Sequence, residues 1–135
     1  MSDSLRLEVV TPSRRVLQSQ ASEIRIPGAL GELGVLPGHT PLLTSLGTGE
    51  VKFTEGGTTG RLVVQGGFAE VQPDAVTVLA TIAETVDEID VEAARKQLAE
   101  AQEQLKTVSA DDFDAVDAAV RLAEARINAA EGSSA

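Results

Sequence analysis

The chain's only histidine, His39, lies in a proline-rich loop and is the first residue whose side chain could do chemistry. Catalysis by a histidine needs a nucleophile or a carboxylate within reach, and a zinc site needs about three further ligands. The nearest acids, Glu32 and Glu50, form no metal-ligand spacing with it, and the chain has no cysteine. The sequence therefore predicts no catalytic residue and no metal site. We interpret His39 as part of a structural loop or as a contact with a partner.

Two further groups of residues could hold charged ligands. The glycine-rich stretches 28–38 and 56–60 lack the spacing of a phosphate-binding loop, so we interpret them as turns. The carboxylates between residues 87 and 92 are typical of a solvated helix start, where negative charge favours the positive end of the helix dipole. No GxSxG motif is present. These patterns do not indicate an enzyme.

The charge of the chain excludes several partners. The formal net charge is −10 and the basic residues are scattered, which argues against nucleic-acid binding and against a patch for anionic lipid. No apolar run is long enough to cross a membrane, and the N-terminus lacks the features of a signal peptide. We therefore expect no direct insertion into a membrane.

The elements that must position these residues fall into two parts that meet near residue 84. Residues 1–84 carry 9 acidic and 6 basic side chains, whereas residues 85–135 carry 12 acidic and 5 basic ones. Nearly all glycines and prolines lie in the first part. This change predicts a domain at 1–84 and a second one at 85–135.

The first part is predicted to form strands. Hydrophobic residues alternate in LRLEVV (5–10) and SEIRIP (22–27), and turn signals recur every 8–12 residues or so. Such punctuation favours a β-sandwich or barrel with mainly antiparallel sheets. The other predicted strands are 16–19, 33–36, 41–46, 50–54, 61–65, 68–72 and 75–82.

The second part is predicted to form two antiparallel helices. Hydrophobic residues at spacings of three and four form one seam from Val91 to Val108 and another from Phe113 to Ala130, with a break at 109–112. Many of these residues are alanines, which bury little area. The hairpin therefore needs a partner surface, either its own sandwich or another protein.

Three stretches, GELGVLPGHTPLLT (31–44), LEVVTP (7–12) and GGFAEVQPDAVTVLA (66–80), resemble the epsilon subunit of F-type, proton-translocating ATP synthases. The resemblance continues through the helical tail and covers nearly the whole chain. It implies an N-terminal antiparallel β-sandwich of about ten strands followed by a C-terminal antiparallel two-helix hairpin.

The resemblance also implies a function. Members of this family are non-catalytic parts of the central stalk that couple rotation of the membrane ring to the gamma subunit, and so to ATP synthesis. Glu32 and His39 match the positions that contact the ring of c subunits. The expected location is peripheral, on the cytoplasmic face of a bacterial inner membrane or its organelle equivalent.

In the same family the hairpin is regulatory. It can extend to the alpha and beta subunits of the catalytic head and hinder ATP hydrolysis. Arg121 and Arg126 are the only bases of the second helix and are expected to carry that inhibition. Because the helix is otherwise acidic, as are the beta-subunit segments that it would meet, we expect weak inhibition.

Some members also bind ATP at the hairpin. Glu84, Ile89, Asp90 and Arg126 match parts of that site, but Ala93 stands where the motif has an arginine. The loss removes a charge-assisted contact with phosphate, so no cofactor is expected and ATP is at most a weak regulatory ligand.

Two other classes of function stay open at this point. One is a free-standing adaptor whose sandwich and acidic hairpin bind a partner. The other is a small hydrolase that uses His39 with Glu32, which their spacing supports poorly.

Overall fold

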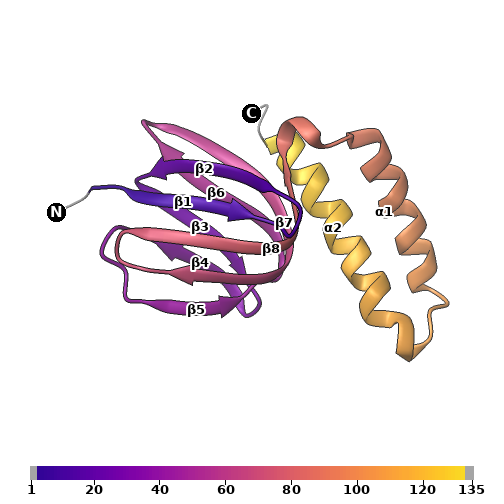
Figure 1. Ribbon diagram of the computed structural model, residues 1–135. Helices are drawn as coiled ribbons and strands as arrows, with labels where there is room; N and C mark the ends of the chain where they lie inside the picture. Colours follow the sequence, from indigo (N-terminus) through magenta and orange to yellow (C-terminus); the bar gives the residue numbers. More distant parts are fainter. Residues whose placement is uncertain (1–2, 133–135) are drawn as a thin grey trace.

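The computed structural model describes residues 3–132 and shows a strand-rich domain with a helical hairpin on one side (Figure 1). The predicted fold class is confirmed. The strands are β1 (Leu5–Val10), β2 (Arg15–Ala21), β3 (Glu23–Gly28), β4 (Gly31–Val35), β5 (Leu42–Ser45), β6 (Thr48–Glu55), β7 (Thr58–Val71) and β8 (Ala75–Thr85). The helices are η1 (Val86–Glu88), α1 (Val91–Leu105), η2 (Ala110–Asp112) and α2 (Phe113–Gly132).

The strands form one folded-over sheet in the order β2-β1-β8-β7-β6-β3-β4, and β5 pairs with β7. Neighbours are antiparallel except β1 and β8, which run parallel. The described residues hold eight strands, where about ten were expected, partly because the predicted runs 61–65 and 68–72 are both parts of β7. The first half of β7 pairs with β6 and the second half with β5, so this strand connects the two layers of the sandwich.

A glycine pair marks the middle of β7. Gly66 and Gly67 have φ angles of 72° and 99°, which few other residues adopt. The register of β7 on β8 is the same before and after this pair, but the core-facing positions change from Leu62 and Val64 to Ala69 and Val71. The glycines therefore reverse which face of the strand points into the core.

The core follows the hydrophobic alternation of the strands. It is built from aliphatic side chains, most of which have no accessible surface, and no helix interrupts the chain between residues 60 and 82. Alternate residues of a strand point to opposite faces, so a period of two places one set inside. The residues predicted as buried are all fully buried: Leu7, Val9, Ile24, Ile26, Val64, Val76 and Val78.

The two helices pack against each other, and α2 lies between α1 and the sheet (Figure 1). α1 begins after Asp90, whose carboxylate caps the helix by accepting a hydrogen bond from the Ala93 backbone N–H at 3.1 Å. The predicted seam has two exceptions. Val108 lies beyond the end of α1, and Phe113, at the first turn of α2, is about half exposed.

A second face of α2 packs on the sandwich. Leu122, Ala125 and Ala129 cover the fully buried Val63 of β7, with Ile82 and the linker residues beside them. The sandwich is thus the partner surface that the alanine-rich hairpin needs.

Candidate functional site

Glu32 and His39 lie at two ends of the edge strand β4. Glu32 is the second residue of the strand, and His39 follows its other end in the loop before β5. The part of β4 after Glu32 alone spans about 10 Å. The Glu32 carboxylate binds the Arg25 guanidinium at 3.2 Å, and His39 Nδ1 lies 2.6 Å from the carbonyl oxygen of Thr40. The two side chains therefore do not form a catalytic pair.

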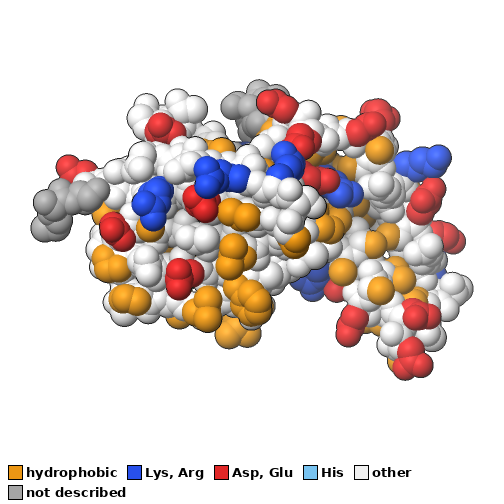
Figure 2. Space-filling view, viewed as in Figure 1, with side chains coloured by type: hydrophobic (Ala, Val, Ile, Leu, Met, Phe, Trp, Pro, Cys, Tyr) orange, Lys and Arg blue, Asp and Glu red, His pale blue; other side chains and the backbone are white. Residues whose placement is uncertain are grey.

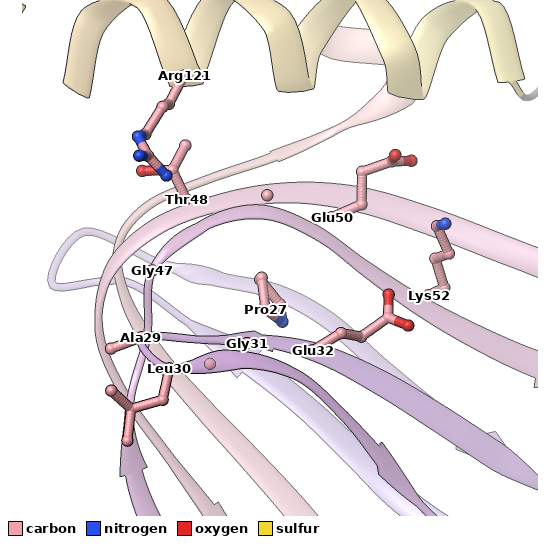
Figure 3. A pocket seen from close by; sticks show the side chains of 12 residues that line it. Pro27, Ala29, Leu30, Gly31, Glu32, Gly47, Thr48, Glu50, Lys52 and Arg121 are labelled. Carbon is pink, nitrogen blue, oxygen red and sulfur yellow. The ribbon is translucent and has the colours of Figure 1, made fainter. Parts of the chain in front are cut away.

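Glu32 lines a polar cleft between the β3–β4 turn, β6 and α2 (Figure 3). The cleft has a volume of about 490 Å³, and Lys52 of β6 lies on the same side as Glu32. Arg121 extends from α2 toward Thr48 at the opposite end. A residue expected to touch the ring and one expected to act in inhibition thus share one cleft, which their spacing in the sequence did not predict.

The outer face of the second half of β7 carries a group of exposed hydrophobic side chains. Phe68 and Leu79 are direct cross-strand neighbours, 53% and 50% exposed, and Val10 lies beside Leu79 on β1. Leu43 of β5 is 68% exposed and opposes Glu70, two residues from Phe68. We call Val10, Leu43, Phe68 and Leu79 the outer apolar surface.

Space-filling shows hydrophobic side chains gathered on this side of the sandwich, over the region of β5 and β8 (Figure 2). A shallow hollow of about 350 Å³ lies among Val10, Pro12, Phe68 and Leu79. Contiguous exposed apolar surface of this kind marks a protein–protein contact more often than a free surface.

Four residues matched to the ATP-binding motif come together at the base of the hairpin. Glu84, Ile89, Asp90 and Arg126 line a hollow of about 200 Å³, below the usual size of a ligand pocket. Asp90 already caps α1, and Arg126 already binds Glu84 through two hydrogen bonds of 2.7 and 2.9 Å. The charged groups of this hollow are thus engaged within the protein.

The linker between the sandwich and the hairpin is held by a second ion pair. Arg14, in the β1–β2 turn, donates hydrogen bonds of 2.9 and 2.7 Å to the Glu88 carboxylate of η1. This contact, helped by hydrogen bonds from the Thr85 backbone and side chain, lowers the pKa of Glu88 to about 2. The carboxylate therefore stays charged at physiological pH.

We expect the Arg14–Glu88 contact to stabilise the fold in a pH-dependent way. The pKa of Glu88 is lower in the folded state than in the unfolded state. The contribution of its carboxylate to the free energy of unfolding is therefore complete above pH 4.3 or so and disappears as the pH falls toward about 2. The free energy of unfolding of Glu88→Gln should therefore differ from that of the wild type above pH 5 and converge with it in acid. A difference that is independent of pH would contradict this assignment.

Comparisons with known proteins agree with this architecture. Residues 4–86 match the family model described as the ATP synthase delta/epsilon chain β-sandwich domain. The ATP synthase epsilon chain of Geotalea uraniireducens is 45% identical over 132 residues, covering 96% of both chains. That of Myxococcus xanthus is 48% identical over 128 residues, covering 93% of this chain and 94% of its own.

A solved structure is similar over the same length. A chain in the mitochondrial ATP synthase of Euglena gracilis, from an assembly of OSCP, F1 and c-ring, superposes with a TM-score of 0.83 at 28% identity. The match covers 97% of this chain and 83% of the Euglena chain.

The matched sandwich domain places the protein in the delta/epsilon class of ATP synthase subunits. Within that class, the chain belongs to the family of ATP synthase epsilon chains. It is thus a non-catalytic subunit of the central stalk of an F-type ATP synthase, associated peripherally with the membrane. No helix among residues 3–132 is long and apolar enough to cross a membrane.

Sequence reasoning missed several residues of these sites. The sequence does carry a signal for the outer apolar surface. Phe68 and Ala69 are adjacent apolar residues in β7, and Val78 and Leu79 are adjacent apolar residues in β8. Adjacent apolar residues in a strand indicate that both faces are covered. The Arg14–Glu88 contact had no local signal, since its partners are 74 residues apart.

Proposed function

We propose that this chain docks on the c ring along the edge of β4 and on the gamma subunit through the outer apolar surface, on the cytoplasmic face of the membrane. The main observation in support of this proposal is that the outer face of β7 is covered along only part of its length. α2 covers the outer face of its first half, at Val63, whereas Phe68 in the second half stays exposed. A rotor subunit with a partner on that face explains the difference.

The β4 edge suits an extended polar partner. Glu32 and His39 lie near its two ends, so a ring of repeated loops could touch both without bringing them together. Leu30, in the turn before β4, is fully exposed. Pro37 and Pro41 limit the backbone freedom lost on docking of the loop around His39.

The hairpin is proposed to regulate ATP hydrolysis by reaching the alpha and beta subunits, with Arg121 and Arg126 as its basic contacts. Arg121 suits this role because its side chain is 66% exposed and its hydrogen bond goes to Asp117 on the same helix. ATP is proposed as no more than a weak regulatory ligand, because the hollow near Arg126 is small and Ala93 lines it.

Substituting both ring-contact residues tests the docking proposal. Glu32→Lys with His39→Ala should lower proton-driven ATP synthesis several-fold in reconstituted membranes, because the charge and the imidazole that face the ring are lost. The isolated subunit should stay folded, since Glu32 is exposed.

Glu23→Lys is the matched control. Glu23 binds the same Arg25 guanidinium at the same distance of 3.2 Å, so its reversal removes an equivalent ion pair away from β4. Wild-type synthesis by the double variant, or an equal loss in the control, would contradict the assignment of Glu32 and His39 to the ring. A double variant that unfolds would show that the loop is structural instead.

A further inference from the structure

The sheet and both helices of the hairpin meet at one ion pair. Arg126 of α2 binds Glu84 of β8 through two hydrogen bonds of 2.7 and 2.9 Å, and their side chains are only 19% and 26% exposed. The remaining terminal nitrogen, Nη1, donates to Gln97 of α1 at 3.1 Å. One guanidinium thus joins the sandwich to both helices.

A second polar contact lies two turns earlier on α2. Gln65 of β7 donates to the Ala118 carbonyl oxygen at 3.0 Å and to Thr48 of β6 at 2.9 Å. The apolar contact of α2 with Val63 is made by one leucine and two alanines. Alanine buries little area, so we expect the polar contacts to decide how firmly the hairpin docks.

We propose that the Glu84–Arg126 pair is a latch that holds the hairpin on the sandwich without a bound nucleotide. Paired hydrogen bonds between a guanidinium and a carboxylate are strong and directional, and partial burial shields this pair from solvent. A phosphate group that bound Arg126 would compete with Glu84 and Gln97 for the N–H groups of its guanidinium. A role of the latch in regulating ATP hydrolysis rests on the proposed function. Docking of the hairpin on the sandwich through this ion pair does not rest on it.

Loss of either partner should release the hairpin. Glu84→Gln leaves the guanidinium of Arg126 without its counter-charge, and Arg126→Ala leaves a half-buried carboxylate unpaired. Hydrogen bonds to charged groups are strong enough that the ratio of docked to undocked chains should fall about tenfold or more. Reversal of the pair, Glu84→Arg with Arg126→Glu, restores the opposite charges and should recover most of the docking.

The fraction of chains with a docked hairpin can be followed through the distance between the sandwich and the hairpin in the full chain. The chain has no cysteine, so Gln72→Cys and Gln104→Cys allow two spin labels to be attached. Gln72 follows β7, at the end of the sandwich away from the linker, and Gln104 lies in the last turn of α1. Pulsed electron paramagnetic resonance then gives the distance distribution in nucleotide-free buffer, and circular dichroism reports whether the strands stay folded.

Lys96→Ala is the matched control, because it removes a positive charge from an exposed position of α1. The latch predicts one narrow distance distribution for the wild type and for Lys96→Ala, and a broader, shifted distribution for Glu84→Gln and Arg126→Ala. Three results would overturn it: a wild type that docks only after ATP is added, equal opening in the control, or a charge reversal that stays open. None of these results bears on ATP synthesis, which tests the proposed function separately.

Discussion

Replacing Gly67 by alanine is expected to destabilise the sandwich more than any other single methyl group added to a strand. A Cβ at this position would lie 1.9 Å from the Leu79 carbonyl oxygen, which belongs to the backbone of β8 and cannot move without breaking the pairing. The φ angle of 99° adds strain for any side chain. Together, strain and overpacking should cost about 3–5 kcal/mol.

Urea denaturation of the full chain measures this effect as a lower transition midpoint. Gly34→Ala is the matched control, because Gly34 lies in strand β4 and its added Cβ would meet nothing within 4 Å. The control should keep a midpoint near that of the wild type. A Gly67→Ala chain as stable as Gly34→Ala would show that the reversal of the core-facing side of β7 does not depend on glycine.

Placing two charges on the outer apolar surface should strongly weaken binding to the gamma subunit. Phe68→Asp with Leu79→Asp puts two carboxylates directly opposite each other where the proposed interface has its largest side chains. Burying unpaired charge at the centre of an interface is costly, and we expect affinity to fall at least about a hundredfold. Both side chains are about half exposed, so the core does not depend on them.

Calorimetric titration of purified gamma subunit with the variant gives the affinity. Thr58→Asp with Thr59→Asp is the matched control, since it adds the same charge at exposed positions of the same strand, outside the outer apolar surface. The control should bind like the wild type. Undiminished binding by the Phe68–Leu79 variant would exclude this surface as the gamma contact.

The sequence allowed the core of the sandwich to be predicted because its strands alternate cleanly. Leu7 and Val9, or Ile24 and Ile26, lie on one face of a strand and are all fully buried. The continuity of β7 could not be predicted in this way, because the two glycines reverse the alternation at Gly66 and Gly67. In the sequence, one strand whose alternation of apolar residues changes phase looks the same as two strands joined by a turn.

The hairpin was predicted more fully than its docking. Regular spacing identified the seam between the helices, including the buried Ala94 and Ala123. Leu122 lies on a second face of α2, and spacing alone does not say what such a face covers. Glu84 and Arg126 were matched to a nucleotide site through the family resemblance, whereas the structure shows them bound to each other. Contacts between residues 42 positions apart depend on how the domains pack.

The most direct test of the assignment of this chain to the rotor is proton-driven ATP synthesis by membranes from which the native epsilon chain has been removed. An ATP synthase that lacks this stalk subunit should couple proton flow to synthesis poorly. We expect that adding the full wild-type chain to such membranes, with a gamma subunit and c ring from the same source, restores synthesis. Synthesis that stays at the depleted level, although the added chain is folded and present in excess, would contradict the assignment of this chain to the rotor.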